Sequence, residues 1–342
     1  MKTDQILPFL AVFACATALL WTACEREVDF AGQLPDSRIA ITGFVEAGQP
    51  VAVRVTRSWN LAGNAGDYTL RDVAVSLYLN GALQPPMQFD AGAQPPQYRS
   101  ASVARAGDRV RIAVRREGFP EASAETAVPS HASPILSIDT VRFRDGNGSD
   151  AMRFLIRIKD PAAGQQDYYR LLVEERSSVD SGQWSSRSVD FDCDQDAALS
   201  EGFRSPSGDL LMNEAQNIYG IFSDGIFDGG EHTLNIHFLP QYPGPTGIQW
   251  LPDPDTEYGP FVPVAQDTVL QVHYVFKLVT LSSSAYLYLK SRSLYESHGE
   301  NGALFAEPAI IHTNVTGGLG ILGAFRTDTA GVDMPPWKTE EQ

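Results

Sequence analysis

Cysteine is scarce in this sequence: 342 residues contain three cysteines, and only Cys193 lies beyond residue 24. A single cysteine cannot form an internal disulfide, so the fold of the later residues does not depend on one. No histidine or asparagine signature of a thiol enzyme accompanies Cys193. We therefore interpret it as a packed or loop thiol rather than as a nucleophile.

Catalytic motifs are missing as well. The six histidines show no HExxH or HxH spacing, and no serine stands in a GxSxG pattern. The glycines of TGGLGILG (316–323) resemble a dinucleotide loop only loosely and lie among strand-like residues, so we expect them to relieve crowding or to form a bulge. These absences favour a non-enzymatic protein, since a hydrolase would need a site assembled from distant carboxylates.

Positive charge is in short supply: 26 lysines and arginines stand against 42 aspartates and glutamates, for a net charge of −16. Such a surface repels polyanions, which argues against nucleic acid or an anionic membrane patch as a partner.

Long apolar runs are limited to the N-terminus, where residues 6–20 are almost wholly apolar but fall short of the roughly 20 residues that a spanning helix needs. The layout is that of a signal peptide, predicted here as residues 1–23. Its exit, LWTAC, resembles the lipobox of bacterial lipoproteins, with Trp21 where leucine is usual. We expect Cys24 to be acylated and residues 24–35 to form a tether; an ordinary secretory peptide with a spare thiol is the alternative.

Acidic residues follow Cys24 at once, in the stretch EREVD. This start resembles the surface-export signal of outer-membrane lipoproteins in some Gram-negative groups. It predicts an outer-membrane lipoprotein, held by its lipid anchor and facing the cell surface.

Alternation of apolar and polar residues dominates the rest of the chain, for example in RIAITGFV (38–45) and DVAVSLYLNG (72–81). Short alternating runs between turn residues indicate antiparallel strands with one buried face. We therefore predict a mostly β fold with two β-sandwich domains: an Ig-like or transthyretin-like domain at 36–130 and a larger one at 131–328. Residues 180–216 are predicted to form a long loop or an insertion, and residues 329–342 a disordered tail.

One helix is expected, at about 282–298. The stretch SSSAYLYLKSRSLYESHG begins with serines that can cap a helix, ends at a glycine, and has helical apolar spacing.

Seven segments in order resemble the lipoproteins grouped as domain of unknown function 4249, which are common in Bacteroidota. These segments are CEREVD, GFVEAGQP, DVAVSLYLNG, DPAAGQQDYYRLLV, FSDGIFDGGE, AYLYLKSRSLYES and TNVTGGLGILGAF. The chain departs from the family pattern before Asn314 and in its acidic 180–216 segment.

The resemblance implies a β-rich outer-membrane lipoprotein encoded beside TonB-dependent transporters, and hence an accessory to such a transporter in nutrient uptake. It implies no known reaction and carries over no catalytic residue. The alternative is an independent surface adhesin that binds a glycan, a peptide or another protein.

A calcium-loop spacing is the sharpest local signal in the sequence. Asp190, Asp192, Asp194, Asp196 and Glu201 stand at positions 1, 3, 5, 7 and 12 of such a loop, where alternate carboxylates can converge on one ion. Gln195 stands where the turn needs glycine, and no flanking helix is expected. A solvated acidic loop is the favoured interpretation, with structural calcium as the only cofactor considered.

Aromatic residues gather on a proline-rich stretch at 241–261. Tyr242, Trp250, Tyr258 and Phe261 would suit a glycan or protein contact if the stretch is exposed. The alternative is a loop that folds back and caps its own sandwich.

Overall fold

A computed structural model describes the following parts of the chain: residues 37–58, 68–144, 150–179, 183–203, 216–238, 249–251, 262–264, 270–300 and 310–334. The N-terminal residues, Cys24 among them, therefore lie outside the described part. Among the described residues, no helix has the length and apolarity needed to cross a membrane.

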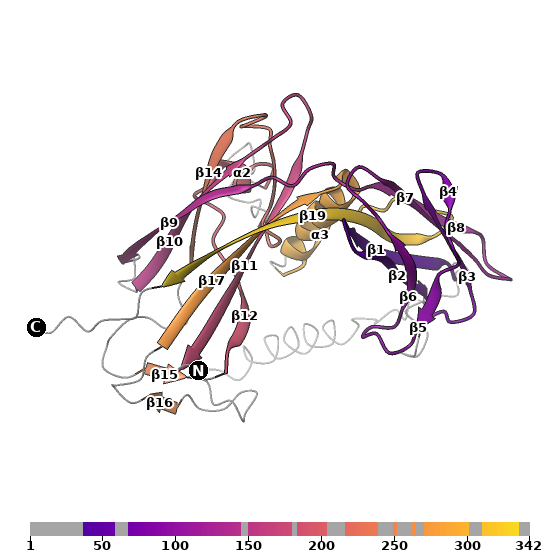
Figure 1. Cartoon of the computed structure of the whole chain (residues 1–342), viewed down its shortest axis with the longest axis horizontal. Coiled ribbons are helices and arrows are strands. Elements are labelled where there is room, and N and C mark those ends of the chain that lie inside the picture. Colours follow the sequence, from indigo (N-terminus) through magenta and orange to yellow (C-terminus); the bar gives the residue numbers. More distant parts are fainter. Residues whose placement is uncertain are drawn as a thin grey trace, which may run out of the picture. The chain divides into compact units, whose positions relative to one another are not determined.

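The largest sheet in the described part has nine strands and is built around β19 (Leu319–Met334), drawn in yellow in Figure 1. On one side of β19 lie, in order, β17 (Leu270–Leu281), β11 (Tyr168–Val179) and β12 (Ser185–Val189), and β13 (Ile221–Ser223) also pairs with β11. On the other side lie β1 (Ile39–Glu46), β2 (Pro50–Arg57), β6 (Gln97–Val103) and β5 (Gln88–Asp90).

Two smaller sheets complete the two sandwiches, and a short hairpin stands apart. One sheet has the order β18 (Val315–Thr316), β8 (Ala122–Ala127), β7 (Arg109–Arg115), β3 (Ala74–Leu79) and β4 (Ala82–Leu83). The other has the order β14 (Glu231–Phe238), β10 (Asp150–Lys159) and β9 (Ile135–Arg144). The hairpin consists of β15 (Gln249–Leu251) and β16 (Val262–Val264).

The alternation of apolar and polar residues in the sequence corresponds to an alternation of buried and exposed residues in the structure, as expected for strands of a sandwich. In β1 the residues Ile39, Ile41 and Val45 are buried while their neighbours are partly or fully exposed. One apolar cluster fills the sandwich of β1, β2, β3, β6, β7 and β8, and a second lies between β10 and β14 on one side and β11 and β17 on the other. The predicted mostly β, sandwich-type fold with one substantial helix is confirmed.

The last strand, β19, belongs to both sandwiches. The first part of β19 pairs in parallel with β1, and the part after Phe325 pairs antiparallel with β17. Leu322 and Ala324 are fully buried in the first core, whereas Met334 belongs to the second. The first sandwich therefore contains residues from both ends of the described chain, a connection that local periodicity could not reveal.

The glycines at the start of β19 are required by close backbone approach, as predicted. Gly320 has a φ of +102°, and a Cβ there would overlap the carbonyl oxygen of Ile41. Gly317 has a φ of +73° and lies as closely against the carbonyl of Glu121. A side chain at either position would push β19 away from its neighbours.

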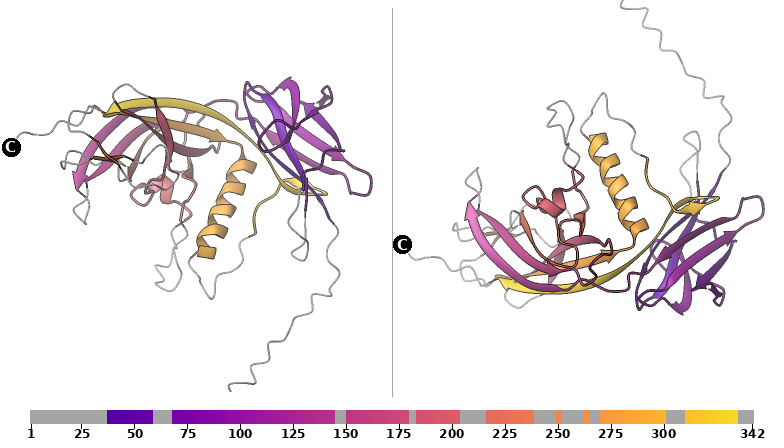
Figure 2. Two further views of the ribbon diagram at one scale, coloured as in Figure 1. Left: turned by 90° about the horizontal axis from the view of Figure 1, so that it is seen from below. Right: turned by 90° about the horizontal axis from the view of Figure 1, so that it is seen from above.

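The predicted helix is α3 (Ser283–Glu300), which packs against β19 and β11 (Figure 2). Its start is capped by Ser282, whose Oγ accepts a hydrogen bond from the backbone N–H of Ala285. Ala285, Tyr286 and Leu289 form its buried side.

Two sequence-based expectations were wrong. Residues 180–216 are not simply a loop, because they contain β12 and a short helix, α2 (Ala197–Ser200). The polar sequence of β12 concealed a strand that pairs with β11 from Val189 to Ser185. The predicted tail also begins too early, since the strand β19 continues through Met334.

Candidate functional site

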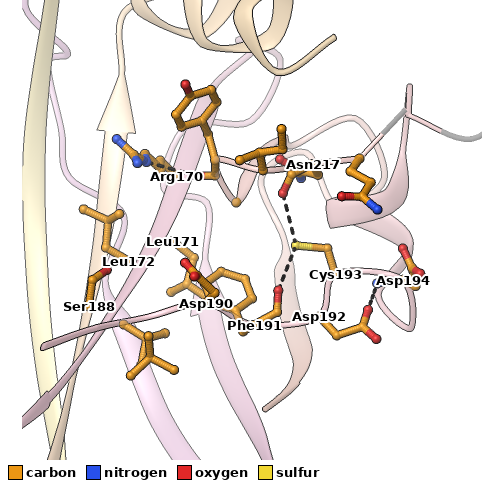
Figure 3. A pocket seen from close by; sticks show the side chains of 16 residues that line it. Arg170, Leu171, Leu172, Ser188, Asp190, Phe191, Asp192, Cys193, Asp194 and Asn217 are labelled. Atoms are coloured by element: carbon orange, nitrogen blue, oxygen red, sulfur yellow. Dashed lines mark hydrogen bonds between the residues drawn. The ribbon is translucent and has the colours of Figure 1, made fainter. Parts of the chain in front are cut away.

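A pocket of about 470 Å³ opens where one edge of β11 passes from one partner strand to another (Figure 3). The early part of β11 pairs with β13 as far as Arg170, and its later part pairs with β12 from Val173 onward. Between the two, the backbone N–H of Leu171 donates to the carbonyl of Gly220. The pocket is lined by β11, by residues 188–194 and by residues 216–220.

Cys193 lies at this pocket, in surroundings that disfavour its thiolate form. It is 8% exposed, and its Sγ donates weak hydrogen bonds to the carbonyls of Asn217 (3.7 Å) and Phe191 (4.0 Å), drawn in Figure 3. Burial, reinforced by the neighbouring aspartates, raises the pKa of the Cys193 thiol to about 12. A nucleophilic cysteine needs the opposite shift.

The five carboxylates of the predicted calcium loop do not converge. Asp190, Asp192 and Asp194 line the pocket. Asp192 bonds to the N–H of Asp194 and lies 3.3 Å from His237. Glu201 lies beside Gly225, on a different loop. Among the described residues, the side-chain groups close enough to share a metal ion include none of these five.

Asp196 has a structural role that explains why it turns away from the other four. Its carboxylate caps α2 by accepting from the N–H groups of Ala198 and Leu199, and it also accepts from the N–H of Asn235. His232 lies 3.3 Å away. Burial alone would raise the pKa of Asp196, but the hydrogen bonds from His232 and from these N–H groups outweigh it and lower the pKa.

The remaining predicted site residues lie largely outside the described part. Tyr242, Tyr258 and Phe261 are not described, nor is Cys24. Trp250 is described only by its backbone, in β15, where it pairs with Pro263 of β16. The glycan-contact and cap interpretations of this stretch therefore remain predictions.

A second cavity, of about 640 Å³, lies between the end of β8, the start of β11 and the start of α3. Its polar lining includes the amides of Gln165 and Gln166, the carboxylates of Glu125 and Asp167, the imidazole of His312 and several hydroxyls, and its apolar lining includes Tyr168 and Leu287. Among the described residues, no lysine or arginine belongs to this lining. We call this cavity the polar groove; its chemistry suits a neutral, hydroxyl-rich ligand better than an anionic one.

Two loops place four aspartates together that the sequence analysis did not assign to any site. The first loop (160–167) joins β10 to β11, and the second (224–230) joins β13 to β14. Asp160 and Asp167 stand at the ends of the first, and Asp224 and Asp228 lie on the second. The two loops are about 60 residues apart in the sequence, so their contact could not be predicted from local patterns. The glycines and repeated aspartates of both loops are the only shared signal.

Backbone hydrogen bonds hold the two loops against each other. Asp160 accepts from the N–H of Gly229 (2.7 Å), and Asp228 accepts from the N–H of Gly164 (2.7 Å). Asp224 accepts from the N–H of Asp167 (2.9 Å). Asp167 also lies 2.8 Å from Nε2 of His131, so this side of the cluster borders the polar groove.

Comparison with known proteins identifies the family. Residues 25–330 match the family described as Domain of unknown function (DUF4249), and the chain therefore belongs to it. No curated protein shows a significant match to the sequence. Both loops of the aspartate cluster lie inside the matched range.

Proposed function

We propose that this chain is a non-enzymatic, surface-exposed lipoprotein of the outer membrane that acts as an accessory to a TonB-dependent nutrient transporter. The observation that carries the proposal is the position of the family match, which begins at residue 25, directly after Cys24. A family region that begins next to a cysteine with a lipobox-like exit before it fits the expected arrangement of a lipid-anchored protein. The transporter partner is inferred from the resemblance to a family whose genes lie beside those of TonB-dependent transporters.

Two features of the described residues support binding rather than chemistry. The thiol in the 470 Å³ pocket has a raised pKa, which disfavours the thiolate that nucleophilic catalysis needs. The described residues of the polar groove offer amides, hydroxyls, carboxylates and the imidazole of His312 but no lysine or arginine, a lining suited to hydrogen-bonding a neutral nutrient.

The proposal is tested by isolating tagged full-length protein from detergent-solubilised outer membrane and identifying its partners by mass spectrometry. We expect one TonB-dependent barrel in stoichiometric amount, and labelling of the protein on intact cells. A Cys24→Ser variant is the control, since it removes the acylation site and should abolish outer-membrane recovery. Surface labelling without any barrel partner would contradict the accessory role.

The polar groove also favours a second candidate, an independent adhesin that binds a glycan or peptide. Hydroxyls and amides around Tyr168 could hold a sugar ring without help from a second protein. Glycan binding by the purified protein alone would support the adhesin, whereas binding only in the presence of a barrel would support the accessory.

A further inference from the structure

The 470 Å³ pocket beside β11 is lined by charges of both signs. Among the described residues of its lining, Arg170 is the one basic side chain, and the acidic ones are Asp190, Asp192 and Asp194. Figure 3 draws Arg170 on one side of the pocket and Asp192 and Asp194 on the other. Its volume lies within the range of roughly 300–1,000 Å³ that is usual for small-molecule sites. The pocket therefore offers a positive side and a negative side to a small ligand.

Arg170 is a partly buried cation without a carboxylate partner. Within the described part of the chain its guanidinium forms no ion pair, and its one hydrogen bond runs from Nε to the carbonyl oxygen of Tyr219 (3.0 Å). Burial lowers the pKa of Arg170, and only the phenol of Tyr219 opposes this shift. In contrast, Arg187 of β12 is paired with Glu175. The two terminal nitrogens of Arg170 are therefore available to an anionic group from outside the chain.

The guanidinium of Arg170 is also held in place before any ligand binds. Its Cζ lies 5.4 Å from the centre of the Tyr219 ring, and the phenol of Tyr219 donates to Glu296 of α3 (2.7 Å). The loop that carries Tyr219 is anchored by Asn217, whose side-chain amide bonds to both the carbonyl and the N–H of Ile221. A side chain that is already positioned loses little conformational entropy when it binds a ligand.

Asp190 supplies the opposite charge to the same pocket. It directly follows Val189, the last residue of β12, and it is exposed. Among the described residues it has no basic partner, and Arg170 is not within ion-pair distance of it. Asp192 differs, because it lies 3.3 Å from His237. Two opposite charges that line one pocket without pairing with each other can be bridged by a ligand that carries both charges.

The mixture of charges selects the class of ligand. Three aspartates would repel a ligand that carries only negative charge, and Arg170 would repel a ligand that carries only positive charge. The lining also contains the apolar side chains of Leu172, Phe191 and Ile218, which suit a hydrocarbon group between the two charges. An ammonium, a carboxylate and a hydrocarbon group occur together in amino acids and short peptides.

We infer that this pocket binds a free amino acid or a short peptide, with the ligand carboxylate on Arg170 and the ligand ammonium on Asp190. Both contacts are hydrogen bonds between charged groups, which are the stronger kind. The inference concerns a different site and a different class of ligand from the neutral nutrient of the polar groove. It does not rest on the lipid anchor or on the transporter.

The test uses purified full-length protein in detergent, without any barrel, titrated in a calorimeter with L-leucine and with trialanine. We expect saturable binding of at least one of them, with one ligand per chain; leucine alone would indicate an amino-acid site, and trialanine a peptide site. The N-acetylated form of the bound probe lacks the ammonium, and its C-terminal amide lacks the carboxylate. Each blocked form should bind at least tenfold more weakly, since a hydrogen bond between charged groups contributes about a factor of ten or more.

Two variants locate the ligand. Arg170→Gln and Asp190→Asn should each weaken binding at least tenfold, and because Asp190 is exposed, Asp190→Asn should keep the circular dichroism spectrum of the wild type. Arg176→Gln and Asp228→Asn are the matched controls, since neither residue lines the pocket, and they should bind like the wild type. No binding of either probe, equal binding of a blocked form, or unchanged affinity in Asp190→Asn would overturn the inference.

Discussion

Four aspartates lie in the acidic segment 190–196, and four lie in the paired loops 160–167 and 224–230 taken together. The two regions differ in how far these carboxylates are exposed and in the partners that offset their negative charge. In the acidic segment, Asp190, Asp192 and Asp194 remain exposed, and the one buried carboxylate, Asp196, has His232 and three backbone N–H donors. In the loops, Asp160, Asp167 and Asp224 are all buried, and the one basic partner found among the described residues is His131.

The comparison teaches that regular spacing of carboxylates is a poor guide to a metal site. Alternate residues converge only if the backbone curls around a centre, and here residues 190–196 instead run from β12 into α2. Burial decides how strongly neighbouring carboxylates repel one another, because water no longer screens the repulsion.

The largest effect is expected from removing the basic partner of a buried carboxylate elsewhere in the protein. That carboxylate would then be buried without a cation beside it, like the buried aspartates of the two loops. Arg187 donates two hydrogen bonds of 2.9 Å to Glu175, whose side chain is 1% exposed. We expect Arg187→Ala to lower the free energy of unfolding by about 3 kcal/mol, because Glu175 would stay buried without a cation. Urea denaturation measures this loss. Arg176→Ala, which breaks the more exposed pair with Glu174, is the control and should cost less than about 1 kcal/mol.

A smaller loss is expected from removing the carboxylate cap of α2. Asp196→Ala leaves three backbone N–H groups and His232 without their acceptor, and we expect a loss of about 2 kcal/mol in urea denaturation. The exposed Asp194→Ala should change stability by less than about 0.5 kcal/mol. Equal losses in the two variants would contradict the structural role assigned to Asp196.

The smallest of the three effects is expected in the pH dependence of stability. Ionisation of the carboxylate should stabilise the fold in the acidic segment and destabilise it in the two loops. The pKa of Asp196 lies below its ordinary value of 3.8, so its contribution is present above about pH 4 and is lost as the pH falls through the lowered pKa. The pKa of Asp224 lies above 3.8, so its ionised form weakens the fold at pH 7 and protonation relieves this as the pH falls.

Denaturation between pH 3 and pH 7 checks these signs. Asp224→Asn should be more stable than the wild type at pH 7, and the difference should shrink as the pH approaches 4. Asp196→Ala should be less stable than the wild type at pH 7, and its deficit should shrink only below about pH 4. If both variants were more stable than the wild type at pH 7, or both less stable, the proposed difference between the two regions would be wrong.

Local patterns were sufficient for the strands and for α3, since period-two alternation and serine capping act over a few residues. They failed for β12, where serines and an arginine pair with β11 without an apolar signal. They also failed for the aspartate cluster of the two loops. The segments DPAAGQQD and SDGIFDGG were recognisable as marks of the family, but their meeting requires β10, β11, β13 and β14 to be assembled first.

The sequence by itself determined the class of fold, the position of the helix and the family, because each depends on short-range periodicity or on ordered motifs. Only the tertiary structure decided which aspartates meet, which carboxylate caps α2, and that β19 closes both sandwiches. These outcomes depend on contacts between residues far apart in the chain. For the same reason the four aspartates that were regularly spaced did not converge, while three from separate loops did.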